Sequence, residues 1–378
     1  MKKFLPIAQV IVGVLFIFSG LIKANDPSGL SYKMQEFFEV WGWHGLNDFT
    51  LAMSIAMIAF EIIAGAAVLL GWRFPLFSWL LLLLILFFTF LTGYALLSGK
   101  IRECGCFGDC IKLTALDSFV KDLVLLVLIL VLFYYRRQVK SLFNHRTSLA
   151  IITLTTFFSL WIQYYVLKHL PIVDCLPYKK GANIPENMKI PAGAIPDSTV
   201  IMFKYTRAGQ QVEFDADHFP DDFDDSLYQF VGRYDKLVRK GNAQPPIKDL
   251  VMLSPSGTDT TQAVLQHQGP MLILFSRHFD SEDISWGEEL KLIHAKASAA
   301  GIPLVWVSAD AEQASSILAK QLVADIPVLR GDLVAIKTAA RANPTLYLLE
   351  SGTVREKWSY AHFNSVPNRL VQANPKSR

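Results

Sequence analysis

The sequence lacks the motifs that mark several common enzyme classes. It has no glycine-rich phosphate loop, no Ser-His-Asp set and no internal repeat, which argues against nucleotide-dependent enzymes, serine hydrolases and solenoids. The net charge of +3 comes from scattered basic residues, so no nucleic-acid partner is expected. Cysteine is also scarce, with four in 378 residues and none after Cys175. Any thiol chemistry must therefore come from the first half of the chain.

Long apolar runs dominate that first half. With 52% hydrophobic residues the chain is too apolar for one soluble domain. Each run has about the roughly 20 residues needed to cross a bilayer core. The first run is long and has no A-x-A cleavage site, so we interpret it as a span rather than a signal peptide. The sequence predicts five membrane spans: Phe4–Ala24, Leu51–Leu70, Phe74–Leu97, Phe119–Tyr135 and Ser148–Leu170.

The basic residues of the short loops predict an orientation, because such residues are retained in the cytoplasm. Lys2 and Lys3 precede the first span, Arg73 lies between the second and third, and Arg136 and Arg137 follow the fourth. We therefore expect a bacterial inner-membrane protein whose N-terminus is cytoplasmic. The loop after the third span and the whole C-terminal region would then be periplasmic. All four cysteines would share this oxidising compartment.

The cysteines are the candidate redox thiols. Cys104, Cys106 and Cys110 lie in one short polar loop after the third span, and Cys175 follows the fifth. A disulfide-exchange site needs a thiolate nucleophile and a resolving thiol. The same four cysteines would also serve as two static disulfides. A zinc site is a weaker alternative because of the C-x-C spacing, and we expect no metal. Four cysteines can form two disulfides in three different ways, and the sequence does not choose among them.

Two sequence runs carry a resemblance to known membrane families. The first span ends FSGLIKANDP at residues 18–27, and the cysteine loop contains CGCFG at residues 104–108. With Glu61 and Gly71-Trp72, these runs resemble the DoxX family and its relative, the methylamine utilisation protein MauE family, over about residues 1–140. The resemblance implies a four-helix membrane bundle linked to thiol, sulfur or quinone redox and to disulfide formation. The resemblance favours redox-active cysteines over structural ones, and it implies quinone as a candidate electron carrier.

Glu61 is a carboxylate inside an apolar run, which is costly unless the group is paired, neutral or in a wet cavity. A proton relay or a quinone-facing group is one interpretation. The alternative, which we favour, is a structural role, either a helix-packing hydrogen bond or a pair with Lys23 near the outer end of the first span. Both residues are candidate binding residues.

The external half begins with a proline-rich stretch. We predict an irregular neck over residues 171–244, with a small hairpin between Val200 and Phe214. Beyond it, strands alternate with helices and end in a hairpin, which indicates an α/β domain. Strands are expected at Met271–Phe275, Pro303–Ser308, Pro327–Leu329, Thr345–Leu349 and Thr353–Trp358, and helices at Ser285–Ala300, Ala311–Leu322 and Leu333–Arg341.

This order resembles thioredoxin-like domains over about residues 245–362, with Pro344 where that family has its cis-proline. Where the family has C-x-x-C, this chain reads Arg277-His278-Phe279-Asp280. The domain therefore cannot exchange disulfides itself. Pro344 would shape an edge for an extended peptide or simply form a turn.

The predicted architecture is thus an α-helical membrane bundle, with a four-helix DoxX-like core and a fifth span, followed by a thioredoxin-like domain. The expected divisions are residues 1–146, 147–170, 171–244 and 245–378. The predicted function is thiol–disulfide redox of exported proteins, with electrons exchanged with a carrier such as quinone. The alternative is a non-catalytic scaffold or assembly factor with structural disulfides. Expected partners are the lipid bilayer and periplasmic thiol proteins.

Overall fold

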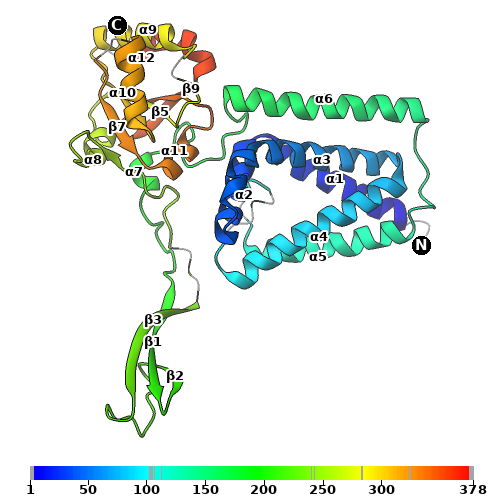
Figure 1. Ribbon diagram of the computed structural model, residues 1–378. Helices are drawn as coiled ribbons and strands as arrows, with labels where there is room; N and C mark the ends of the chain where they lie inside the picture. Colours follow the sequence, from blue (N-terminus) through cyan, green and yellow to red (C-terminus); the bar gives the residue numbers. More distant parts are fainter. Residues whose placement is uncertain are drawn as a thin grey trace. The chain divides into compact units, whose positions relative to one another are not determined.

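The chain divides into two compact units, Met1–Ala182 with Val251–Arg378, and Asn183–Leu250. The computed structural model (Figure 1) describes residues 4–101, 105, 107–111, 113–239, 241, 243–281, 284–322 and 325–373. The first unit contains a helical bundle and an α/β domain, and the second contains a small sheet. The insertion of a small unit between the two parts of a larger one was not predicted.

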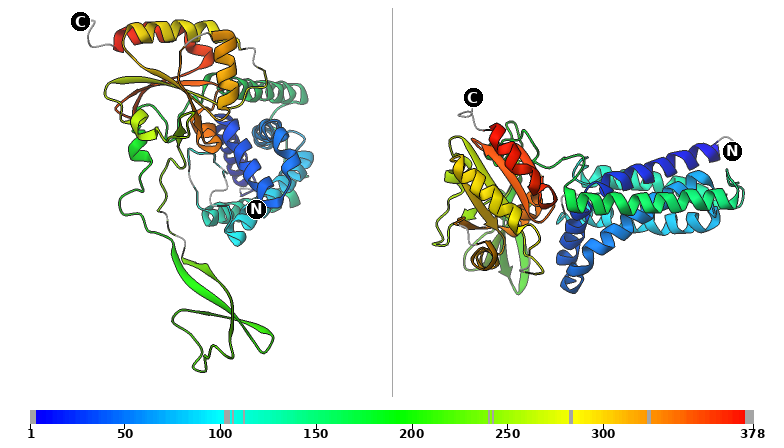
Figure 2. Two further views of the ribbon diagram at one scale, coloured as in Figure 1. Left: turned by 60° about the vertical axis from the view of Figure 1, so that its left-hand side comes forward. Right: turned by 90° about the horizontal axis from the view of Figure 1, so that it is seen from above.

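The bundle consists of long apolar helices that run side by side (Figures 1 and 2). Small residues allow its first two long helices to approach closely. A Cβ atom added at Gly65 would lie 2.8 Å from the carbonyl oxygen of Gly13, so neither position has room for a side chain. The long helices are α1 (Phe4–Ala24), α3 (Thr50–Leu70), α4 (Phe74–Ser98), α5 (Ala115–Tyr134) and α6 (His145–His169).

Four of the described helical segments are long and apolar enough to cross a membrane: Phe4–Ala24, His44–Leu70, Phe74–Ser98 and His145–His169. They correspond to four of the five predicted spans. The remaining one forms helix α5 as expected, but Asp117, Lys121 and Asp122 lie in its first half. These charges lower the hydropathy of α5, so composition alone does not identify it as a span.

Helix α2 (Pro27–Trp41) was not predicted. Its N-cap is Asp26, whose side chain accepts a hydrogen bond from the Gly29 amide, and proline occupies the first turn. The helix ends at Gly42, which has φ of 74°, a conformation that favours glycine. Asp-Pro is a recognised helix-start signal, but the helix is too polar and short to stand out beside the spans.

The α/β domain has a six-stranded sheet in the order β4-β7-β6-β5-β8-β9. The three central strands β7, β6 and β5 are parallel, whereas β8 and β9 form an antiparallel hairpin at one edge. This is the predicted thioredoxin-like α/β arrangement, and the Asn343–Pro344 peptide is cis as that resemblance implied. The strands are β4 (Met252–Leu253), β5 (Pro270–Ser276), β6 (Leu304–Ser308), β7 (Val328–Gly331), β8 (Thr345–Glu350) and β9 (Thr353–Ser359).

Helices cover this sheet and complete its core. Helices α9 and α12 pack side by side against it (Figure 2). Trp306 on β6 is fully buried and contacts Trp286 edge-on, which in turn contacts Phe363. The helices are α8 (Thr261–Leu265), α9 (Gly287–Ala299), α10 (Ala311–Ile317), α11 (Leu333–Ala339) and α12 (Val366–Ala373).

The second unit is an antiparallel sheet of order β2-β1-β3 with the short helix α7 (Ile184–Asn187). Strands β1 (Ser198–Arg207) and β2 (Gln210–Asp215) form the predicted hairpin, whereas β3 (Gln229–Arg239) was not predicted. An aromatic cluster around Tyr205, including Phe214 and Phe219, packs on it.

The start of the predicted neck is not a free linker. Tyr178 is buried, the Gly181 amide donates to the Val354 carbonyl, and the Val354 amide donates to the Ala182 carbonyl. Residues 171–182 therefore belong to the first unit and bond to β9. The prolines made this segment irregular without preventing it from packing.

Candidate functional site

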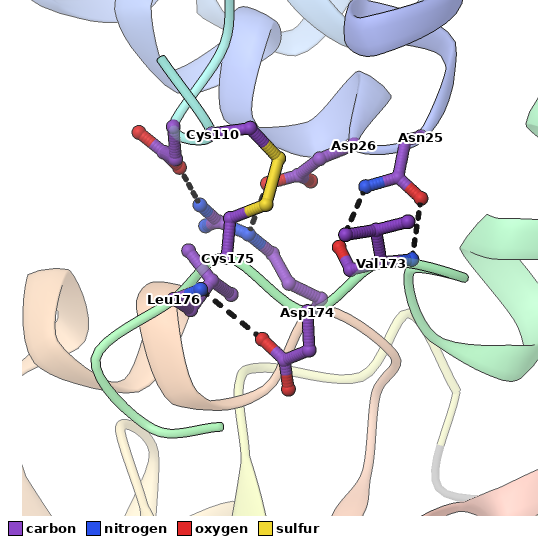
Figure 3. Close-up of a disulfide and its surroundings, with 9 residues drawn as sticks. Asn25, Asp26, Cys110, Val173, Asp174, Cys175 and Leu176 are labelled. Carbon is purple, nitrogen blue, oxygen red and sulfur yellow. Dashed lines mark hydrogen bonds and ion pairs between the residues drawn. A yellow bond between two sulfur atoms is a disulfide. The ribbon is translucent and has the colours of Figure 1, made fainter. Parts of the chain in front are cut away.

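Two of the four candidate thiols form a disulfide, Cys110–Cys175, with Cα atoms 4.9 Å apart (Figure 3). It joins the loop between α4 and α5 to the segment after α6. Both cysteines are half-buried. Cys104 and Cys106, the other predicted redox thiols, lie outside the described residues. The observed disulfide belongs to one of the three pairings left open by the sequence.

The disulfide constrains the path of the chain. Cys110 precedes α5 and Cys175 follows α6, so these two helices together return the chain to one end of the bundle. Helix α6 is long and apolar enough to span a membrane. If α6 crosses, α5 has to cross as well for the two sulfur atoms to meet. Two charges of α5 pair with each other: Asp122 is fully buried, pairs with Lys121 at 2.8 Å and accepts a hydrogen bond from Thr92.

A buried arginine lies next to the disulfide. Arg341, which follows α11, bonds through Nε to Asp26 and through Nη2 to Asp109, both at 2.8 Å. Asp109 directly precedes Cys110. Burial alone would lower the pKa of Arg341, but the charges of Asp26 and Asp109 outweigh it and raise that pKa. The α/β domain is thus held to the cysteine loop by a permanent cation.

Other contacts extend this attachment. Arg277 Nη1 donates to Tyr32 Oη at 2.7 Å, and Lys337 Nζ donates to Gln35 Oε1 at 2.9 Å. Tyr32 and Gln35 lie on α2. Arg277 stands where the thioredoxin-like family begins its C-x-x-C motif, so that part of the cysteine-free domain lies against the membrane bundle.

Pro344 lies inside the α/β domain, whereas His278 lies on its surface. Pro344 is buried, and its carbonyl accepts a hydrogen bond from the Tyr360 amide. The binding role predicted for Pro344 stays a prediction. His278 bonds to Asp310 at 3.0 Å on the surface, which agrees with a solvated histidine.

The structure brings together the two polar residues predicted inside the bundle. Lys23 Nζ lies 2.5 Å from Glu61 Oε1, and the Ser19 hydroxyl donates to the other carboxylate oxygen at 3.2 Å. Both charged residues are buried. The Lys23 ammonium also lies 4.7 Å from the centre of the Phe88 ring. The Lys23–Glu61 pair is therefore present. Lys23 lines two cavities, and Glu61 lines the smaller one.

The larger cavity holds about 220 Å³ and is mostly apolar. Gly105, from the cysteine loop, forms part of its wall. The sequence did not reveal this cavity because α2 supplies one side of it. Its lining includes Lys23, Leu30, Lys33, Met34, Phe37, Phe38, Trp41, Trp43, Leu46, Met53, Met57, Phe87, Phe88, Leu91 and Thr92. The smaller cavity is lined by Lys23, Glu61, Lys121 and Asp122, among others.

Comparison with known proteins agrees with the two-part description. The profile of the family described as methylamine utilisation protein MauE matches residues 1–135, which confirms the resemblance of that part to MauE. A domain of unknown function, DUF8463, matches residues 199–240. No curated protein matches.

Among solved structures, peroxiredoxin Q of Xanthomonas campestris matches with 19% identity and a TM-score of 0.26, covering 33% of this chain and 90% of its own. The thioredoxin-like assignment of the α/β domain depends on its strand order and not on this likeness.

Proposed function

We propose that this membrane protein oxidises thiols of exported proteins and passes the electrons to a membrane carrier such as quinone. The observation that carries the proposal is the position of the cysteine loop. One cysteine of that loop is in a disulfide, and Gly105 of the same loop lines an apolar cavity inside the bundle. The loop that carries the observed disulfide thus borders an apolar cavity, which supports electron transfer from thiols to a lipid-soluble carrier. The similarity of residues 1–135 to MauE supports the same conclusion.

The electron balance needs one carrier molecule for each disulfide formed. One thiolate of the exported protein would attack the Cys110–Cys175 disulfide, form a mixed disulfide and release the other cysteine as a thiol. The second thiolate of the exported protein would then attack the mixed disulfide, so that the exported protein gains a disulfide and both Cys110 and Cys175 become thiols. A second exchange oxidises these thiols at the expense of a Cys104–Cys106 disulfide. The resulting dithiol gives two electrons and two protons to quinone, which becomes quinol.

This function requires the cysteine loop and the α/β domain on the periplasmic side of a bacterial inner membrane. Arg136 and Arg137, between α5 and α6, would then be cytoplasmic. An alkaline phosphatase reporter fused after Arg137 should be inactive and one fused at the C-terminus should be active. The opposite pattern would place the thiols in the reducing compartment and exclude the proposal.

Thiol trapping in intact cells tests the chemistry. The free thiols of Cys104, Cys106, Cys110 and Cys175 would be labelled and mapped by mass spectrometry, with and without a block in respiratory quinone turnover. We expect reduced cysteines to accumulate under the block. Cysteines that stay fully bridged in both conditions would contradict a redox role.

The scaffold alternative is favoured by one observation. Arg341, Arg277 and Lys337 tie the cysteine-free domain to the bundle, and Cys110–Cys175 adds a covalent tie. This attachment would serve a static assembly factor. Co-purification of a partner by the variant lacking all four cysteines, with no change in cellular thiols, would support it.

A further inference from the structure

We infer that the larger cavity is a binding site for the ring of an isoprenoid quinone, with Lys23 as the hydrogen-bond donor to a ring carbonyl. The inference deepens the proposed function, on which it rests, by assigning the carrier to a site. Nothing in the predicted roles of Glu61 and Lys23 specified this cavity, because it forms only when α2 packs against α3 and α4.

The cavity has one buried end and one exposed end. Its buried end contains Lys23, which is 3% exposed, Phe37 at 5% and Thr92 at 1%. Its rim contains Trp43 and Phe87, which are 54% and 43% exposed. In a membrane these exposed apolar side chains face lipid or its interface. A ligand that enters from the bilayer between Trp43 and Phe87 would therefore meet apolar walls before it reaches the buried Lys23. The second lysine of the lining, Lys33, is partly exposed and pairs with Glu36 at 2.9 Å.

Size and lining favour a flat ring with a tail. The cavity of about 220 Å³ is smaller than the roughly 300–1,000 Å³ that encloses a drug-sized molecule. One ring fits inside and a long tail must remain in the bilayer. Aromatic rings line both the interior and the rim, with Trp41 packed edge-on against Trp43 and Tyr94. Such walls stack on planar π-systems.

Lys23 provides the polar recognition. An ammonium group has three N–H donors, and Glu61 accepts one of them. The charge of Lys23 is held in place by Glu61, so it can also stabilise the negative charge that develops on a quinone oxygen during reduction. An acyl chain offers no acceptor to this group. The buried ion pair therefore discriminates a quinone from the hydrocarbon part of a phospholipid.

Calorimetric titration of the full-length protein in phospholipid nanodiscs with a short-chain ubiquinone tests the inference. We expect saturable binding. The substitution Met57→Trp, which fills the cavity, should weaken it at least about tenfold. Lys23→Met should weaken it by about 10- to 100-fold, the effect of losing a hydrogen bond from a charged group. The matched control Leu154→Trp adds the same side chain at a 69% exposed position of α6 and should leave binding unchanged.

Two further arms separate this inference from the proposed function. A variant with all four cysteines replaced by serine should bind quinone as tightly as the natural chain, whatever the role of the thiols. If the Lys23→Met variant does not fold, the comparison of quinone binding by the Met57→Trp and Leu154→Trp variants decides whether the cavity is the binding site. The inference is overturned by absence of saturable binding, by equal binding of Met57→Trp and Leu154→Trp, or by a phospholipid that native mass spectrometry detects and quinone does not displace.

Discussion

Arg341 and Asp26 form a buried ion pair at 2.8 Å across 315 residues of sequence. Asp26 caps α2 and Arg341 follows α11, so one contact joins the start of a membrane-bundle helix to the α/β domain. Asp109 shares the same guanidinium group. Because Asp109 is the chain neighbour of Cys110, the position of the disulfide depends on a residue of the cysteine-free domain.

Removal of that arginine should strongly destabilise the protein. Arg341→Met leaves Asp26 and Asp109 without their cation, and breaking a buried pair in this way costs about 3–5 kcal/mol. The matched control is Arg355→Met, since Arg355 pairs with Glu350 on the surface and such pairs contribute about 0–1 kcal/mol. Thermal unfolding followed by tryptophan fluorescence in nanodiscs measures both. Equal effects of the two substitutions would contradict the role of Arg341.

Lys23 and Glu61 should be strongly coupled. Each single substitution, Lys23→Met or Glu61→Gln, alters a buried pair in which both side chains are almost fully enclosed, whereas the double substitution removes both charges. We expect the double variant to be less destabilised than the sum of the singles, by about 1–3 kcal/mol. A double-mutant cycle of unfolding free energies tests this. Additive effects would show that the two charges do not depend on one another.

The disulfide should stabilise the folded protein independently of its redox role. Its cysteines are 65 residues apart, and closing a loop of this kind typically contributes about 2–4 kcal/mol. Cys110→Ser, Cys175→Ser and the double variant should show the same loss of thermal stability. A reducing agent should lower the stability of the natural chain and leave the double variant unaffected. A different response of the two single variants would argue for another pairing.

The stability of the α/β domain should fall in acid partly through Asp310. The hydrogen bond from the Gln313 amide, followed by that from His278, lowers the pKa of Asp310 below its ordinary value of 3.8. Since the folded pKa is below the unfolded one, this stabilisation is complete above pH 3.8 and is lost as the pH falls through the folded pKa.

Two substitutions separate charge from helix capping at this position. Asp310 is the N-cap of α10. Asp310→Asn keeps a good cap and should show a smaller loss of thermal stability than the natural chain as the pH falls below 3.8. Asp310→Ala should also lose about 0.5–2 kcal/mol at neutral pH. An unchanged pH profile in Asp310→Asn would assign the acid response to other groups.

The parts of this fold that local patterns determine were predictable. Apolar runs located α1, α3, α4 and α6 because a bilayer demands continuous hydrophobicity, and the alternation of strands and helices located the α/β domain. Helix α2 was missed, since its Asp26-Pro27 start gives only a short local signal. The Lys23–Glu61 pair was anticipated because an unpaired charge at depth is costly.

The candidate site is formed by contacts between residues that are far apart in the sequence, and motif spacing does not predict such contacts. Four cysteines permit three pairings, and Cys110–Cys175 follows from the return of the chain through α5 and α6. Arg341 had no local motif, because its partners lie 232 and 315 residues away. The cavity could not be anticipated without α2, which supplies Phe37, Phe38 and Trp41 to its wall.

The second unit begins and ends at neighbouring points of the backbone. The Ile247 amide donates to the Asn187 carbonyl at 2.8 Å, although 59 residues lie between these two positions (247 − 187 − 1). An insert with adjoining ends behaves as a cassette, because its removal leaves a gap that a short loop closes. Engineers could exchange strands β1 to β3 for an affinity tag or a fluorescent module there. During evolution the same unit could be inserted or deleted at this position without disrupting the rest of the fold.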